Sequence, residues 1–419
     1  MAELTGAKRT GPRPLPVHLA TALGTWMNSC AVSPIWKNGS LPSNPNAPHL
    51  TARSVELRRR LEAVPTEAFS RAVAHAAAER HRNLIDAILR YRHHDYRRDV
   101  VDPPAVWQAG TTRVLDYGQV PEASDPDGPR LLCIPSLINR AYILDLKSDT
   151  SFLRYLAAGG YRPLLVDWGW PGAAEYAADL TGYVAGKLEA ALDFACDLAG
   201  EPVPVLGYCM GGTLAVALAQ RRPREAAALV LLAAPWDFHA EQPARAALVS
   251  ETGRMLEPLL QAHGALPVDM IQMLFNGLDP QTSVRKFLGF GRMQPESARA
   301  EAFVALEDWL NDGVPLPAAV ARACLREWYG GNAPARGEWR IAGRPVDPAE
   351  VRCPSLVVAP AGDRIVPPGA ATPLGSVMPT STTWTPSAGH IGMVTSRRAR
   401  SEIWAPLLTW LNARVVQRT

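Results

Sequence analysis

The sequence predicts an α/β protein with a mostly parallel sheet and helices on both faces. Short, continuously apolar segments alternate with amphipathic segments between residues 111 and 237, and the alternation resumes after residue 353. Strands buried on both faces of a parallel sheet have this unbroken apolar character, whereas half-exposed strands alternate polar and apolar residues. Between these two parts, the chain is predicted to be mainly helical.

The apolar and amphipathic segments give the expected elements in chain order. Each strand is short and ends in turn residues, and each helix has apolar residues at helical spacing. The expected elements are strands at TTRVLDYG, RLLCIP and YRPLLVDW, a helix at LTGYVAGKLEAALDFACDLAG, a strand at PVPVLGY, a helix at MGGTLAVALAQ, strands at AAALVLLAAP, PSLVVAPAGD and STTWTP, and a helix over about 397–415.

These elements divide the chain at residues 100, 237 and 352. Residues 101–237 and 353–419 are the two parts of the sheet domain, and residues 238–352 form a helical cap inserted over its active-site edge. Residues 1–100 carry 15 Lys and Arg against 8 Asp and Glu, so the N-terminal region is basic. Its first 50 residues are rich in Pro, Asn and Ser, which predicts loops and a segment separable from the catalytic body.

A helical stretch is expected from about Ser54, divided by Pro65. Its second part carries basic residues that form either a solvated face or a surface for an anionic partner. These residues are Arg80, Arg82, Arg90, Arg92, His93 and His94.

The composition excludes several classes of protein. A net charge of +3 argues against nucleic acid as the main partner. No apolar run reaches the roughly 18 residues that span a bilayer, so we expect a cytoplasmic protein. The cysteines are scattered without a CxxC pair, which argues against a disulfide framework and a cysteine zinc site. They are Cys30, Cys133, Cys196, Cys209, Cys324 and Cys353.

The motif with chemical content is Gly207-Tyr208-Cys209-Met210-Gly211, which lies between a predicted strand and a predicted helix. A nucleophile on such a sharp turn requires small neighbours, and glycine at both flanks meets that need. N–H groups at the start of the following helix stabilise a thiolate and an oxyanion. Cys209 is therefore the candidate nucleophile; a buried structural cysteine is the alternative.

The order of the following polar residues suits a nucleophile–acid–base triad. Asp363 lies just past the strand at PSLVVAPAGD, and His390 lies 27 residues later, past another short strand. Asp363 is the expected acid and His390 the expected base. Asp237, at the end of the preceding strand, is the alternative acid.

Backbone N–H groups are expected to complete the site. Met210 follows the nucleophile, and Ile138 and Asn139 lie in the loop after an early strand, where Pro135 has no N–H to offer. The remaining histidines lack metal-ligand spacing, so no metal is expected.

Together these residues resemble the polyhydroxyalkanoate synthase family, which consists of cysteine acyltransferases of the α/β-hydrolase fold. The resemblance covers about residues 96–411 and includes CIPSLINRAYILDL, LLVDWGWP, GYCMGG, ALEDWLNDGVPLP and SAGHIGMVTS. GYCMGG and the GHIG segment are its specific parts. The ending GHIGMVTS resembles the short synthases that need a second subunit, whereas residues 1–95 match no named part of the longer synthases.

The resemblance implies that Cys209 carries the acyl group, His390 is its base and Asp363 its acid partner. It further implies polymerisation of (R)-3-hydroxyacyl-CoA into polyester with CoA release and no cofactor. A homodimer, a second synthase subunit and a polymer granule surface are the implied partners. Two alternatives remain: a hydrolase that cleaves thioesters or esters, such as a thioesterase or intracellular polyester depolymerase, and a granule-associated scaffold with the same fold.

Overall fold

The computed structural model of the protein describes residues 9–37 and 48–415. The chain forms two compact units, each continuous in space but not in sequence. The helical unit consists of residues 1–96 and 272–311, and the sheet unit consists of residues 97–271 and 312–419.

The sheet unit is built around a central sheet in which eight described strands are ordered β1-β2-β4-β3-β5-β6-β11-β12. Strand β2 is antiparallel to both β1 and β4, and the strands from β4 to β12 are parallel. The bounds are β1 Ala105–Ala109, β2 Thr112–Asp116, β3 Arg130–Ile134, β4 Arg162–Asp167, β5 Val203–Tyr208, β6 Ala226–Leu232, β11 Ser355–Val358 and β12 Ser381–Trp384.

The predicted strands are all present, and the sequence analysis did not predict β1 or the strands of two small two-stranded sheets among the described residues. The central strands β5, β6 and β11 are buried along their whole length. Their apolar character is therefore explained by cover on both faces. The predicted α/β fold with a mostly parallel sheet is confirmed.

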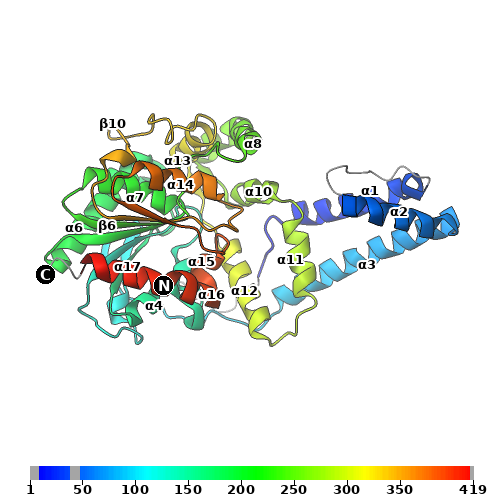
Figure 1. Ribbon diagram of the computed structural model, residues 1–419, viewed down its shortest axis with the longest axis horizontal. Helices are drawn as coiled ribbons and strands as arrows, with labels where there is room; N and C mark the ends of the chain where they lie inside the picture. Colours follow the sequence, from blue (N-terminus) through cyan, green and yellow to red (C-terminus); the bar gives the residue numbers. More distant parts are fainter. Residues whose placement is uncertain (1–8, 38–47, 416–419) are drawn as a thin grey trace. The chain divides into compact units, whose positions relative to one another are not determined.

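Helices cover the sheet on both sides (Figure 1). Helix α6 packs against β3 and β5, α7 against β5 and β6, and α14 against β11 and β12, while α4 contacts β4 and α17 contacts β6. The bounds are α4 Phe152–Ala158, α5 Ala173–Tyr176, α6 Glu189–Ala199, α7 Met210–Arg221, α14 Pro368–Val377, α15 Gly392–Thr395, α16 Arg397–Ala399 and α17 Ala405–Val415.

Between β6 and β11, the sheet unit contains further helices, the antiparallel pair β7–β8, whose strands are far apart in the chain, and the short hairpin β9–β10. Residues 272–311, in the middle of this insertion, belong to the helical unit, and the rest of the insertion belongs to the sheet unit. Its elements are α8 Pro243–Met255, α9 Glu257–His263, β7 Ala265–Leu266, β8 Leu316–Pro317, α13 Ala318–Arg322, β9 Arg340–Ile341 and β10 Arg344–Pro345. Helix α10, Val268–Leu278, spans the point at which the chain passes into the helical unit.

The helical unit joins the N-terminal helices to the middle of the insertion. Its helices are α1 Leu15–Lys37, α2 Pro48–Glu62, α3 Thr66–Arg92, α11 Thr282–Phe290 and α12 Ala298–Asn311. The predicted boundaries at 100, 237 and 352 thus differ from this division, because residues 272–311 of the predicted cap pack with residues of the first hundred.

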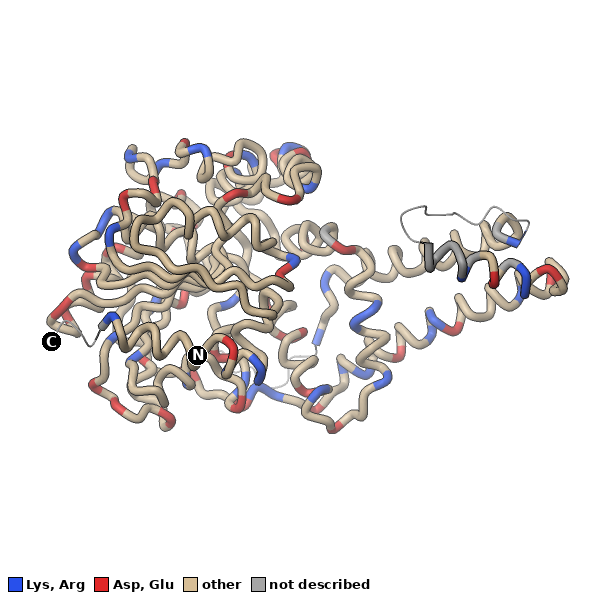
Figure 2. Tube along the Cα trace, viewed as in Figure 1, with Lys and Arg blue, Asp and Glu red and all other residues tan. Residues whose placement is uncertain are grey.

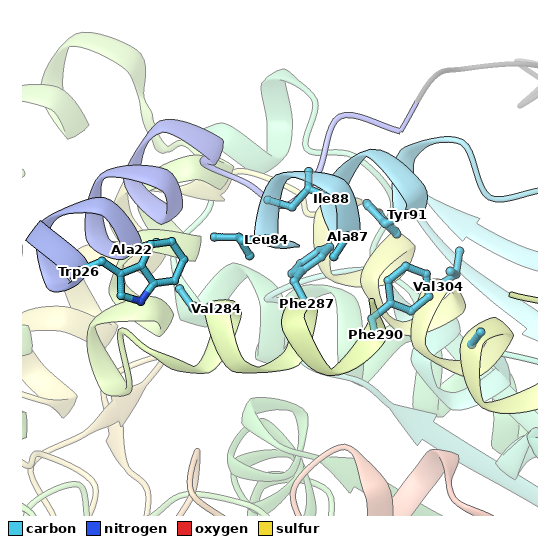
Figure 3. Packing of buried hydrophobic residues seen from close by; sticks show 11 residues of the cluster. Ala22, Trp26, Leu84, Ala87, Ile88, Tyr91, Val284, Phe287, Phe290 and Val304 are labelled. Carbon is cyan, nitrogen blue, oxygen red and sulfur yellow. The ribbon is translucent and has the colours of Figure 1, made fainter. Parts of the chain in front are cut away.

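The predicted loop over the first 50 residues is wrong for α1, while residues 38–47 lie outside the described part. Ala22 and Trp26 of α1 are buried with Leu84 and Ile88 of α3, and Figure 3 shows them facing Val284 of α11. Apolar residues at helical spacing thus outweighed the turn-forming composition that suggested loops. Because α1 contributes to this core, the expectation of a separable segment 1–50 is not supported by the packing.

Two arginines of the basic face predicted on α3 form hydrogen bonds to other segments of the helical unit. Arg90 donates to the carbonyl oxygens of Gly291 and Met293, and Arg92 donates to those of Thr10 and Gly11. Figure 2 shows the basic residues along this helix. Part of the face therefore binds backbone carbonyls of the same unit. This role differs from both predicted alternatives, a solvated face and a surface for an anionic partner.

Among the described residues, no helix combines the length and apolar character needed to cross a bilayer.

Candidate active site

Cys209 lies between the last residue of β5 and the first residue of α7, on a strained turn. Its backbone has φ 56° and ψ −128°, a conformation that residues with a side chain rarely adopt. Two hydrogen bonds fix the turn: Cys209 N donates to Leu232 O of β6 at 2.8 Å, and Gly212 N donates to Cys209 O at 2.9 Å. The hydrogen bonds to β6 and within α7 thus hold Cys209 in its turn at the carboxyl end of β5.

The glycines around Cys209 have no room for a side chain. A Cβ atom at Gly207 would overlap the backbone of Gly212, and one at Gly211 would overlap the carbonyl oxygens of Ile134 and Pro135 at the end of β3. The close approach of α7 to β3 and β5 therefore depends on glycine at these positions.

His390 and Asp363 form a buried pair. His390 Nδ1 and Asp363 Oδ2 are 2.6 Å apart, and the two residues are 8% and 4% exposed. The other oxygen, Asp363 Oδ1, accepts from the N–H groups of Ile365 and Val366, both at 2.8 Å. The carboxylate is thus oriented by its own loop, and its free face is directed to the imidazole.

The side chain of Cys209 lies close enough to the His390 imidazole to interact with it. Burial lowers the pKa of His390, but the charge of Cys209 and the hydrogen bonds to Asp363 and Cys209 outweigh burial and raise the pKa to about 10. His390 therefore holds its proton at neutral pH. The structure brings Cys209, His390 and Asp363 together in one chain of contacts.

Tyr208 is a site residue that the sequence analysis missed. Its hydroxyl donates to His390 O at 3.1 Å, its ring centroid is 5.2 Å from that of the imidazole, and it is buried. The signal available in the sequence was its place immediately before the nucleophile. Tyr208 thus supports the backbone and the ring of the base.

Asp237, the alternative acid, has other partners. Its Oδ1 accepts from His239 N at 3.0 Å, from Ala240 N at 3.1 Å and from the Asn332 side-chain amide at 2.8 Å. No hydrogen bond joins it to His390. Asp237 therefore closes the turn after β6 and ties that turn to the segment at Asn332.

The predicted backbone donors lie around the start of α7 and the loop after β3. Met210 begins α7, where the first N–H groups of a helix have no acceptor within the helix. Ile138 N is already engaged by the Ser136 hydroxyl at 3.0 Å. Asn139 has a left-handed backbone with φ 67°. Met210 is thus the predicted donor that the geometry favours.

A cavity of about 30 Å³ lies beside the acid loop, with room for about one water-sized group. Arg245, Tyr329 and Gln242 provide its polar lining, and Ile365, Val366 and Ala370 are among its apolar walls. Cys209 packs on the small apolar cluster that contains Val366 and Ala370. The cavity and the thiol therefore share a wall.

The α/β-hydrolase fold model matches residues 129–396. The chain is 29% identical to the poly(3-hydroxyalkanoate) polymerase subunit PhaC of Haloarcula marismortui over 328 residues, which are 75% of this chain and 69% of that protein. It is 28% identical to the PhaC subunit of Thiocystis violacea over 72% of this chain and 85% of that protein. A solved esterase from Thermogutta terrifontis is 17% identical, with 75% and 98% of the chains covered and a TM-score of 0.46. The predicted resemblance and fold are confirmed by the family match and the curated relatives.

Proposed function

This chain belongs to the α/β-hydrolase family, and we propose that it is an acyltransferase that polymerises (R)-3-hydroxyacyl-CoA through an acyl-cysteine. One observation carries the chemical part of this proposal. The thiol of Cys209, on the strained turn between β5 and α7, interacts with His390 of the buried His390–Asp363 pair. The names of the curated relatives support the polymerase activity.

The first half-reaction loads the acyl group. The Cys209 thiolate attacks the thioester carbonyl, and the carbonyl electron pair moves onto oxygen, near the N–H of Met210 at the start of α7. When that pair returns, the bond from carbon to the CoA sulfur breaks, and the imidazolium of His390 gives its proton to the departing CoA thiolate. Attacking and leaving sulfur atoms have similar basicity, so a cysteine suits a thioester substrate.

The second half-reaction extends the polymer. The neutral His390 takes the proton of a 3-hydroxyl group, whose oxygen attacks the acyl-cysteine and forms an ester as the Cys209 thiolate leaves. Asp363 keeps the imidazole oriented and stabilises its charged form in both halves. No metal or cofactor is needed for these steps.

We further propose that the chain acts in the cytoplasm at the surface of polymer granules, as a homodimer or with a second synthase subunit. The similarity of the GHIGMVTS segment to the short synthases supports the subunit.

The test is to incubate the purified protein with 3-hydroxybutyryl-CoA and to measure CoA release and turbidity together, with and without a partner subunit. We expect CoA release with insoluble polyester, and a loss of about 10³-fold or more in Cys209→Ala. The matched control is Cys133→Ala, because Cys133 is buried in β3 and burial raises its pKa. Stoichiometric free hydroxy acid without polymer in any condition would identify a hydrolase, and no CoA release would leave only the scaffold.

A further inference from the structure

Arg245 of α8 binds the loop that carries the acid. Its Nη1 donates to Arg364 O at 3.0 Å, and its Nη2 donates to Ile365 O at 3.3 Å. It is half-buried beside the cavity, and none of the described carboxylates forms an ion pair with it. The guanidinium therefore binds two backbone carbonyls of the residues that follow Asp363, and its Nη1 also donates to Gln242 Oε1 at 2.9 Å.

The two peptide groups held by Arg245 are the same two that hold Asp363. The carbonyl of Arg364 and the N–H of Ile365 belong to one peptide group, and the carbonyl of Ile365 and the N–H of Val366 belong to the next. Both N–H groups donate to Asp363 Oδ1. Because a peptide group is planar, a donor that fixes the direction of its C=O also fixes the direction of its N–H. A cation at the carbonyl oxygen also strengthens the N–H on the other side as a donor.

Other contacts join the same two segments. Trp236 N and Asp237 N both donate to Ala370 O, at 2.8 and 3.0 Å, and Gly369 N donates to Glu241 Oε1 at 2.7 Å. These contacts hold the start of α14, whereas among the described residues Arg245 is the one that donates to the carbonyls of the peptide groups that bind the carboxylate.

We propose that Arg245 is a positioning residue: by holding the two peptide groups after Asp363, it keeps that carboxylate aligned on His390. The chain of contacts runs from α8 through the guanidinium, the two peptide groups and the carboxylate to the imidazole. Helix α8 lies in the insertion after β6, so the insertion takes part in the alignment of the triad. The rate measurement that tests this proposal rests on the proposed function, whereas the titration of His390 and the amide hydrogen exchange do not.

The test compares Arg245→Gln and Arg245→Lys with the matched control Arg254→Gln. Arg254 is on the same helix, is exposed and pairs only with Glu251 at 2.7 Å. In Arg245→Gln we expect kcat to fall about 10- to 100-fold with KM within about twofold, because the acid is misaligned while the substrate contacts stay. In the same variant, the His390 pKa, measured by NMR titration of the imidazole, should fall. Arg254→Gln should change neither quantity.

Arg245→Lys keeps the charge but lacks the planar, forked donor geometry of the guanidinium. We expect part of the rate to return and the Ile365 and Val366 amides to exchange hydrogen faster than in the wild type. The proposal is overturned by an unchanged kcat and His390 titration in Arg245→Gln, or by a raised KM with unchanged kcat. If the Gln variant does not fold, unchanged amide exchange and rate in the Lys variant overturn it. The NMR titration of His390 and the amide hydrogen exchange need no substrate. Both measurements therefore still test the proposal if the protein shows no polymerase activity.

Discussion

The loops after β6 and β11 differ little in local geometry, although only one of them holds the base. In each, an aspartate follows the strand and its Oδ1 accepts from two successive backbone N–H groups further along the loop. Asp363 then offers Oδ2 to His390, whereas Asp237 binds the side chain of Asn332. The role of each carboxylate is thus decided by the residue that a distant segment brings to it.

The largest expected difference is in rate. Asp363→Ala should lower the rate of CoA release by about 10²- to 10⁴-fold, because the imidazole loses both its orientation and its counter-charge. Asp237→Ala should leave the rate within about threefold of the wild type and instead destabilise the protein by about 1–3 kcal/mol, since it leaves backbone donors unpaired. Rates under saturating substrate and urea unfolding midpoints measure both effects. An equal rate loss in Asp237→Ala would assign the acid role to the loop after β6.

A steric change in the turn at Cys209 distinguishes a loss of catalytic rate from a loss of folding stability. Gly211→Ala should lower the rate and also cost more than about 2 kcal/mol, because the new Cβ overlaps the backbone at the end of β3. Asp363→Asn should lower the rate with less effect on unfolding. Gly186→Ala is the control, because a Cβ there meets nothing within 4 Å. A Gly211→Ala protein with unchanged thermal unfolding would contradict the steric explanation.

The pH dependence of the two loops should also differ. The pKa of His390 is raised from 6.5 to about 10, so its contribution to stability is complete below pH 6.5 and is lost as the pH rises through 10. In the proposed mechanism this proton is given to CoA, so kcat/KM should fall as His390 loses it near pH 10. In Asp363→Asn the fall should come at lower pH, since one cause of the raised pKa is removed, whereas Asp237→Asn should not move it. Profiles of kcat/KM for the three proteins test this, and a shift in Asp237→Asn would be contrary to expectation.

The smallest effect is expected at the partner of Asp237. Asn332→Ala removes hydrogen bonds to Asp237 and to Phe238 N, and should cost about 1–2 kcal/mol in the free energy of unfolding with little change in rate. Urea denaturation and CoA release are the measurements. A rate loss that exceeds the loss in stability would connect this loop to catalysis.

The sequence was sufficient for seven of the eight described strands of the central sheet and for selecting Cys209, Asp363 and His390, which the structure brings close together. Buried parallel strands have continuous apolar runs, and a tight strand–helix turn requires its glycines, so both features are local and visible. The choice between Asp363 and Asp237 depended on position in the chain, because their loops share the same local hydrogen bonding.

The parts that sequence reasoning missed depend on contacts between distant segments. Arg245 lies in a helix whose sequence carries no catalytic motif, and its proposed role depends on carbonyls 119 and 120 residues away. Helix α1 was predicted as loop because its composition was considered without α3 and α11, on which Ala22 and Trp26 pack. No local pattern reports such a partner.

The discontinuity of the helical unit has a consequence for biosynthesis. Arg90 and Gly291, which bond in the finished unit, are 201 residues apart. At about 5–20 residues per second, the ribosome needs roughly 10–40 s between the two. During that time, α1 and α3 can pair with each other, but the faces that will bury Phe287 and Phe290 stay exposed while the first strands of the sheet emerge. Helices α1 and α3 are therefore made well before α11 and α12, which complete their core, and during this interval their apolar faces need protection from aggregation.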